Sequence, residues 1–177
     1  MKREPLVSII SVNYNTLEVT CEMLESIRRN SYKNLEIILV DNASSENPES
    51  FIIEKYPEVV FIRCAENKGF AGGNNLGIQK AKGEFIFFLN NDAELTDGVI
   101  EELLKVFEQK NRTGLVSPML CFENKDYPKS PDIIQFLGAT SVSPFTARNK
   151  TIARGEKNLG KYHTVQKVAQ ACSPIPC

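Results

Sequence analysis

The feature that most constrains the fold of this 177-residue chain is the alternation of short apolar runs with longer amphipathic stretches over its first two thirds. Short apolar runs bounded by turn signals are typical of buried strands, and such runs lie at 7–12, 35–40, 59–62 and 85–89. Strands that alternate with helices predict an α/β fold with a doubly wound, mainly parallel sheet, helices on both faces and right-handed crossovers.

Local signals set the expected bounds of the helices. The first helix is expected after Asn15, the predicted N-cap, with Glu18 three residues later. The second helix is expected to open at Asn47-Pro48, because proline suits a first helical position. Its inward-facing residues are predicted to be Phe51, Ile52 and Tyr56.

Glycine and proline mark the boundaries of the later elements. A glycine- and asparagine-rich loop at 67–73 is predicted to lead into a short helix that ends at 82–83. A fourth helix is predicted at 99–107 and a fifth strand at 115–117.

From Pro118 onward the pattern changes to prolines interleaved with polar residues, which indicates a long irregular excursion. Within this part, only 165–171 has the pattern of a further strand. We therefore expect a single domain over 1–177, in which a core at 5–120 is followed by an excursion at 121–164 and a last segment at 165–177.

The composition excludes several classes of protein. The chain has 21 Lys+Arg and 22 Asp+Glu, a net charge of −1, so no overall field attracts it to nucleic acid. Its five cysteines are scattered without a CxxC pair, which disfavours a zinc site or a disulfide framework. The apolar run after the N-terminus is too short for a membrane span or signal peptide. We expect a cytoplasmic protein without a transmembrane segment.

Open parallel sheets bind ligands beyond the carboxyl ends of their strands, and four of these ends are polar here. Asp41 can accept a hydrogen bond from a ribose hydroxyl or from the imide N–H of a uracil or thymine ring. Lys68 and the backbone amides of its loop can approach a diphosphate. Asp92, after the run 85–89, can hold a divalent cation whose shell diphosphate oxygens and water complete.

Other interpretations of these residues remain open. Asp41-Asn42 before two serines is also an ordinary turn former, and Asn90-Asn91-Asp92 can be a turn before a helix. The chain has no G-x-G-x-x-G after its first strand, which argues against a dinucleotide site. A nucleotidyltransferase is the less favoured alternative, because it should carry an early glycine-rich, basic loop where this chain has 13–16.

The four polar strand ends together resemble the ordered motifs of one family. The segments VSIISVNYNT at 7–16, ILVDNASS at 38–45, NKGFAGGNNLG at 67–77 and FLNNDA at 88–93 are similar to those of family-2 inverting glycosyltransferases with a GT-A nucleotide-sugar fold. The resemblance covers 5–120 strongly and 165–176 weakly. It is greatest to the branch that transfers rhamnose or galactofuranose to bacterial surface polysaccharides.

This resemblance implies a metal-dependent enzyme that uses Mn²⁺ or Mg²⁺ and transfers a sugar from a UDP- or dTDP-sugar to a glycan or lipid-linked acceptor. It implies that Asp41 contacts the pyrimidine base and that Asp92 binds the metal. The residues expected to bind the donor are Asn13, Asn15, Asp41, Asn67, Lys68, Gly69, Asn74, Asn75 and Asn91. Many relatives have an arginine where Asn74 stands. Without that arginine, Lys68 is the more important positive charge for contact with the diphosphate.

The resemblance places the general base beyond Cys177, so the catalytic base is not assigned. The chain is expected to be the donor-binding part of an enzyme, without turnover alone, and 165–177 the start of a truncated acceptor-side half. The alternative is a non-catalytic module that binds a nucleotide sugar. A homodimer is a further expectation, since an abrupt chain end can expose apolar surface that favours association. Peripheral association with a membrane is also expected.

Overall fold

The computed structural model describes residues 4–122, 133–146, 148–162, 164–165 and 167–168. The chain divides into two compact units, residues 1–98 and 99–177, and each is described by itself. The single domain expected over 1–177 stays a prediction. Among the described helices, none is long and apolar enough to cross a membrane.

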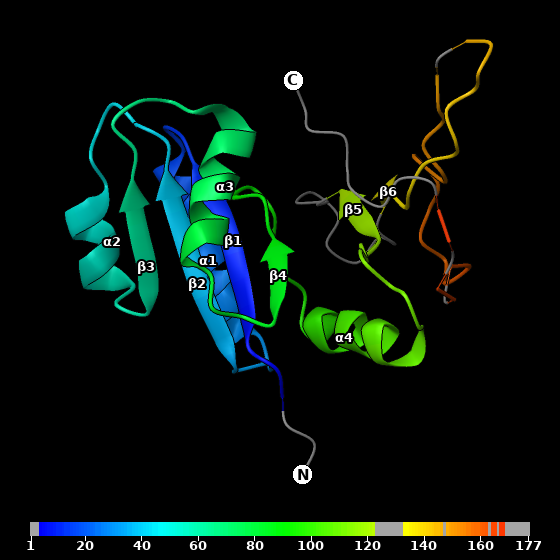
Figure 1. Cartoon of the computed structure of the whole chain (residues 1–177), viewed down its shortest axis with the longest axis horizontal. Helices are drawn as coiled ribbons and strands as arrows, with labels where there is room; N and C mark the ends of the chain where they lie inside the picture. The colour runs from blue at the N-terminus through cyan, green and yellow to red at the C-terminus, as the bar shows by residue number, and fades with distance from the viewer. Residues whose placement is uncertain (1–3, 123–132, 147, 163, 166, 169–177) are drawn as a thin grey trace. The chain divides into compact units, whose positions relative to one another are not determined.

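The first unit is built on a four-stranded parallel sheet (Figure 1). Its strands are β1 (Val7–Asn13), β2 (Leu35–Asp41), β3 (Val59–Arg63) and β4 (Phe85–Phe88), in the order β3-β2-β1-β4. The central strands β1 and β2 are almost entirely buried, which explains why most of their residues are apolar. The predicted α/β fold with a parallel sheet is confirmed.

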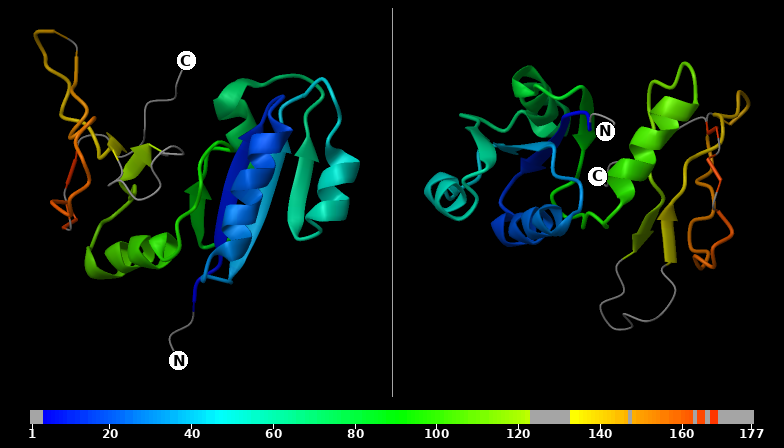
Figure 2. Two further views of the ribbon diagram at one scale, coloured as in Figure 1. Left: turned by 180° about the vertical axis from the view of Figure 1, so that it is seen from behind. Right: turned by 90° about the horizontal axis from the view of Figure 1, so that it is seen from below.

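Three helices connect these strands and cover both faces of the sheet (Figure 2). They are α1 (Leu17–Arg29), α2 (Glu49–Lys55) and α3 (Gly69–Lys80). The helices α1 and α2 lie on one face and α3 lies on the other. The side chains at the carboxyl ends of the strands are therefore held by a core that is covered on both faces.

Helix α3 begins at Gly69, so the predicted loop 67–73 is wrong from Gly69 onward. Gly73 and Gly77 face β1, where a Cβ atom added to Gly77 would come within 2.4 Å of Ile10 Cγ2. A Cβ atom on Gly73 would lie 2.9 Å from Val12 Cγ1. These glycines therefore allow close packing of a helix on a strand, and they do not cradle a ligand.

Two predictions about helix starts are corrected by the structure. Thr16, not Asn15, is the N-cap of α1, because Asn15 adopts a positive φ of 57° and its Oδ1 accepts a hydrogen bond from Ser45 N at 2.8 Å. Pro48 is the N-cap of α2, and the helix begins one residue later.

The prediction of three inward-facing residues on α2 is also partly wrong. Ile52 and Tyr56 are buried, whereas Phe51 is 43% exposed. The ring of Phe51 lies on the outer side of the helix with Lys55 Nζ at 5.6 Å from its centroid. A helix of only two turns buries a narrow stripe, so Phe51 receives a cation–π contact instead of core packing.

The second unit contains α4 (Val99–Gln109), β5 (Leu120–Phe122) and β6 (Ile133–Phe136), and the two strands pair antiparallel. The fourth helix is confirmed. The strand predicted at 115–117 is wrong: these residues are irregular, and Leu115 is 58% exposed.

The excursion predicted at 121–164 is more ordered than expected. It contains β6 and two isolated bridges, Ile133 with Lys157 and Ala139 with Thr151. Of the strand predicted at 165–171, the described residues 165, 167 and 168 are not in a strand, and the others lie outside the described residues.

Candidate functional site

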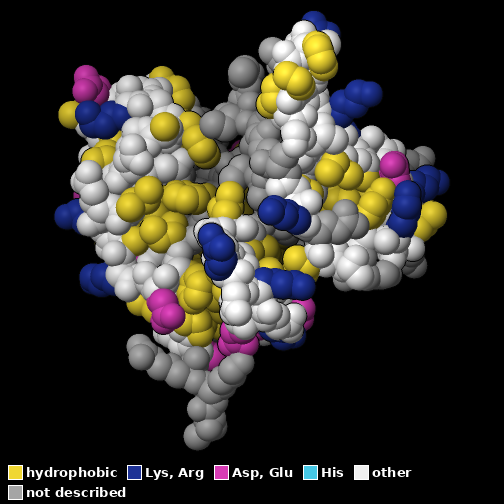
Figure 3. Space-filling view, turned by 45° about the vertical axis from the view of Figure 1, so that its right-hand side comes forward, with side chains coloured by type: hydrophobic (Ala, Val, Ile, Leu, Met, Phe, Trp, Pro, Cys, Tyr) yellow, Lys and Arg dark blue, Asp and Glu magenta, His cyan; other side chains and the backbone are white. Residues whose placement is uncertain are grey.

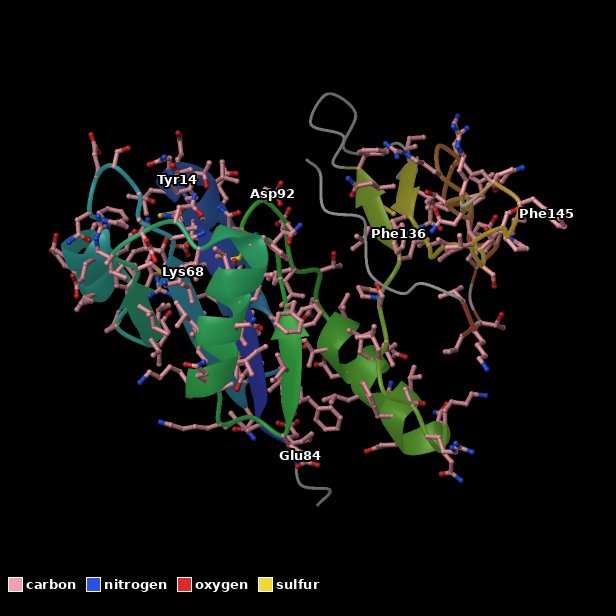
Figure 4. All side chains as sticks on the ribbon, turned by 45° about the horizontal axis from the view of Figure 1, so that its top comes forward. Tyr14, Lys68, Glu84, Asp92, Phe136 and Phe145 are labelled. Carbon is pink, nitrogen blue, oxygen red and sulfur yellow. The ribbon has the colours of Figure 1, made fainter. Side chains whose placement is uncertain are left out.

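The candidate site lies at the carboxyl ends of the parallel strands in the first unit. Figure 4 shows Tyr14, Lys68 and Asp92 at this end, whereas Glu84, just before β4, lies at the opposite end. Tyr14 follows β1 directly, and Lys68 is the N-cap of α3. The sheet therefore brings together residues that are up to 78 positions apart in the sequence, as open α/β sheets do at their ligand sites.

Asp41 ends β2 and is completely buried, with 0% of its surface exposed. Its Oδ1 accepts hydrogen bonds from Asn13 Nδ2 at 2.8 Å and from Ser44 Oγ at 2.5 Å. Its Oδ2 accepts from Arg63 Nη1 at 2.7 Å and from Ser44 N at 3.1 Å. Both oxygens are thus occupied by protein donors, and the guanidinium group compensates the buried negative charge. A nucleobase that forms a hydrogen bond with Asp41 must replace one of these donors.

Asn13 and Asn91 are connected through two threonines at the start of α1. Asn13 Oδ1 accepts hydrogen bonds from Thr20 Oγ1 at 3.0 Å and from Thr16 Oγ1 at 3.3 Å. Asn91 Nδ2 donates to Thr16 Oγ1 at 2.7 Å and to Thr20 Oγ1 at 2.9 Å. The structure therefore brings together two predicted site residues, but their amide groups bind other protein groups.

The side chain of Asn42, directly after β2, forms hydrogen bonds with the loop before α3. Asn42 Oδ1 accepts a hydrogen bond from Lys68 N at 2.9 Å, and Asn67 Oδ1 accepts from Gly69 N at 2.8 Å. The two predicted amide donors at the start of α3 are thus already used within the protein. Lys68 Nζ is different: it lies on the surface in an exposed pair with Glu66, at 3.1 Å, and can exchange this partner for a phosphate.

Asn74 and Asn75, both predicted to bind the donor, lie inside α3. Asn74 is buried, and its Nδ2 donates to Phe70 O at 2.9 Å in the preceding turn. Asn75 is exposed on the helix surface. Asn74 thus uses one of its two amide protons within its own helix.

Asp92 is the exposed carboxylate of the site. Within the part of the chain that the structure describes, it forms no hydrogen bond or ion pair, and no group of three His, Cys, Asp or Glu residues surrounds it. One free carboxylate fits Mg²⁺ or Mn²⁺ if substrate phosphates and water supply the remaining ligands, as hard cations prefer. The residues present are therefore compatible with a cation that binds together with a diphosphate.

Sequence reasoning missed Arg63, Ser44, Thr16 and Thr20, which hold the predicted residues in place. Arg63 pairs with Asp41 in the register of β2 and β3, so its position at a strand end was the available signal. Tyr14 was also missed, although it directly follows β1. This residue is 48% exposed and can contact a ligand.

Cys64 follows Arg63 and is buried beneath the site. Burial raises the pKa of its thiol, and the nearby Asp41 carboxylate raises it further, although Lys68 acts in the opposite direction. The thiol therefore stays protonated at neutral pH, and a protonated thiol is a poor nucleophile. Cys64 therefore belongs to the hydrophobic core and is not a candidate nucleophile.

A parallel sheet with a buried aspartate, an exposed lysine and a free carboxylate at its carboxyl ends fits the GT-A fold of nucleotide-sugar-binding domains. Residues 8–172 match the family model described as Glycosyl transferase family 2, and the chain belongs to this family. The family and fold that the motifs implied are thus confirmed.

Two curated relatives show the extent of this similarity. YwdF, an uncharacterized glycosyltransferase of Bacillus subtilis (strain 168), is 33% identical over 129 residues, which are 71% of this chain and 47% of the relative. The glycosyltransferase GlyG of Streptococcus pneumoniae serotype 4 is 31% identical over 126 residues, 68% of this chain and 41% of the relative. The chain spans less than half the length of each.

A solved structure supports the same fold. The mannosyltransferase PcManGT from Pyrobaculum calidifontis, in complex with GDP-Man and Mn²⁺, superposes with a TM-score of 0.59 and 24% sequence identity. The match covers 70% of this chain and 37% of that chain. At this level of identity the likeness concerns the fold alone.

Proposed function

We propose that this chain is the donor-binding part of a glycosyltransferase that transfers a sugar from a UDP- or dTDP-sugar to a glycan or lipid-linked acceptor, with inversion at the anomeric carbon. The observation that carries the proposal is the free, exposed carboxylate of Asp92 at the same end of the sheet as Lys68 and Tyr14. Membership of family 2 and the Mn²⁺ bound by PcManGT support it.

In this proposal each group has a defined task in holding the donor. Asp92 would hold Mn²⁺ or Mg²⁺ against the diphosphate, and the cation would neutralise charge on the departing nucleoside diphosphate. Lys68 would pair with a phosphate oxygen, and the exposed ring of Tyr14 would stack on the base. The base that accepts the proton of the acceptor hydroxyl is a separate group, which we do not assign.

Asp41 needs a rearrangement to contact a base, because its oxygens are occupied. Of its donors, the Ser44 hydroxyl is the one that rotation about a single bond can withdraw, which would free Oδ1 for the N3–H of a uracil or thymine ring. The pyrimidine preference of the proposal rests on this exchange. GDP-Man, the donor bound by PcManGT, carries a purine and is therefore the informative competitor.

Thermal unfolding in the presence of nucleotides tests the proposal. We expect UDP or dTDP with Mn²⁺ to stabilise the protein by about 2.7 kcal/mol at a hundredfold excess over Kd, and GDP to stabilise it less. Mn²⁺ alone should have little effect. Stabilisation by none of the diphosphates would contradict a donor site. Stronger stabilisation by UTP would favour the nucleotidyltransferase alternative, and binding by a full-length protein that transfers no sugar would favour the non-catalytic module.

We further infer peripheral association with an anionic membrane, which suits a lipid-linked acceptor. The described residues from 133 to 168 include one acidic residue, Glu156, and six exposed basic ones: Arg148, Lys150, Arg154, Lys157, Lys161 and Lys167. Apolar side chains lie beside basic ones on the second unit (Figure 3), and Phe145 is 96% exposed. Basic residues that flank an exposed aromatic ring favour a bilayer surface with anionic lipids.

Sedimentation with lipid vesicles tests this association. We expect binding to vesicles that contain phosphatidylglycerol but not to pure phosphatidylcholine, with a strong dependence on salt. The double change Arg148→Glu/Lys150→Glu should weaken binding by about 30-fold or more, since each basic residue contributes about 1 kcal/mol. Lys80→Glu/Lys82→Glu, in the first unit, is the matched control. Equal binding to both vesicle types, or to neither, would contradict the inference.

The motif likeness also supports a role in bacterial surface polysaccharide synthesis, with the donor bound on the cytoplasmic side. This part of the proposal concerns the whole protein rather than the described site. The homodimer stays a prediction, which the oligomeric state in solution tests.

A further inference from the structure

The buried charge of Asp41 determines the orientation of Asn13. A carboxylate only accepts hydrogen bonds, so the group that faces it at 2.8 Å must be the amide NH₂ of Asn13. The carbonyl oxygen of the same amide is then directed to the other side. Asn13 is only 1% exposed, so water does not offer an alternative partner. The negative charge at the end of β2 thus determines the direction of Asn13 Oδ1, which is an acceptor.

This acceptor in turn determines the orientation of two hydroxyl groups. Thr16 Oγ1 and Thr20 Oγ1 both point at Asn13 Oδ1, at 3.3 and 3.0 Å, and Thr20 Oγ1 also lies 2.9 Å from Thr16 O. A hydroxyl has one proton, and every one of these partners is an acceptor. Each hydroxyl therefore donates its proton to one of these acceptors. Toward its other neighbour, the side chain of Asn91, the hydroxyl oxygen can then only accept a hydrogen bond.

Asn91 lies directly before the candidate metal ligand Asp92. Its NH₂ group has two protons and donates to Thr16 Oγ1 and Thr20 Oγ1, at 2.7 and 2.9 Å. A carboxylate at position 91 would place negative charge against two oxygens whose protons are already directed elsewhere. The mismatch is costly at Thr20, which is buried together with Asn13, so water cannot relieve it there, whereas Thr16 is exposed.

We propose that the chain of hydrogen bonds from Asp41 through Asn13, Thr16 and Thr20 to Asn91 is a positioning relay that holds Asp92 at the end of β4. The relay requires an amide, and not a carboxylate, at position 91. Asn91 is a positioning residue, and its carbonyl oxygen forms no hydrogen bond with any described residue. The inference rests on the proposed function in one respect, the assignment of Asp92 to the metal.

Two aspartate substitutions that add the same charge one residue apart test the relay. Asn91→Asp introduces a carboxylate into the relay, whereas Asn90→Asp places it on an exposed residue whose side chain forms no hydrogen bond with the described part of the chain. We expect Asn91→Asp to lower the Tm of the ligand-free protein and to weaken the Mn²⁺ affinity of the UDP complex by about tenfold or more. Asn90→Asp should leave the Tm unchanged and the Mn²⁺ affinity unchanged or higher.

A second pair of variants separates positioning from general destabilisation. Thr20→Val keeps the volume but removes the hydroxyl, and Thr20→Ser restores it. Thr20→Val should weaken Mn²⁺ binding while UDP binding without metal is unchanged, and Thr20→Ser should recover the Mn²⁺ affinity. Equal Tm values for Asn91→Asp and Asn90→Asp would overturn the relay even if the protein binds no nucleotide. Failure of the unaltered protein to bind UDP with Mn²⁺ would instead contradict the proposed function.

Discussion

Replacement of Asp92 by alanine is expected to abolish the Mn²⁺-dependent stabilisation of the protein by UDP or dTDP. The stabilisation that disappears is about 2.7 kcal/mol at a hundredfold excess of nucleotide over Kd. The physical reason is that Asp92 is the free carboxylate of the described site, so its removal leaves neutral groups and Lys68 beside a cation and a diphosphate. Thermal unfolding with and without Mn²⁺ measures the effect.

A carboxylate in the same loop provides the control for this experiment. Glu94 is also exposed, but it forms an ion pair with Arg29 at 2.6 Å. Glu94→Ala should keep the full Mn²⁺-dependent stabilisation, since a surface ion pair contributes little to stability. If Asp92→Ala is stabilised by nucleotide and Mn²⁺ as strongly as the unaltered protein, Asp92 is not the metal ligand.

The second large effect is expected from Asp41→Ala, which should lower the free energy of unfolding by about 3–5 kcal/mol. The substitution leaves the buried Asn13 amide and Ser44 hydroxyl, and the partly exposed Arg63 guanidinium, without their common acceptor. Because small proteins are stable by only about 5–15 kcal/mol, this loss is a large share of the total. Urea unfolding at neutral pH measures it.

Glu66 provides the comparison for Asp41, because it is an exposed carboxylate in an ion pair with Lys68. Glu66→Ala should change the free energy of unfolding by less than about 1 kcal/mol. The loss in free energy of unfolding for Arg63→Gln should lie between the losses for these two variants, since Arg63 is 30% exposed and Asp41 keeps its other donors. A loss below about 1 kcal/mol for Asp41→Ala would show that its hydrogen bonds do not stabilise the folded unit.

Asp41 and Asp92 have different roles at the candidate site. Asp41 is buried and organises its surroundings, and Asp92 is exposed and available to a ligand. The relay through Asn13 and Asn91 links them over three segments of the first unit. A substitution at Asp41 is therefore expected to disturb Asp92 as well, although no atom of Asp41 needs to contact the metal.

The sequence alone determined the order of strands and helices in the first unit, the strand ends at which the polar residues lie, and the family. These inferences succeed because they depend on local properties. The apolar run 85–89 predicts a strand, and the polar triplet after it then lies at the carboxyl end of the sheet. The predicted burial is only partly right, because Ile86 and Phe88 of β4 are exposed. The motifs at 38–45 and 67–77 carry the family likeness by their residues and order.

Only the tertiary structure decided which polar residues are free and which bind other protein groups. Asn91 and its partner Thr20 are 71 residues apart, and Asp41 and Asn13 are 28 apart, so no local pattern reports these bonds. For the same reason Gly73 and Gly77 suggested a ligand loop, whereas their neighbours in space are Val12 and Ile10. Residue type and spacing specify what a side chain can bind, but the packing of distant segments determines what it does bind.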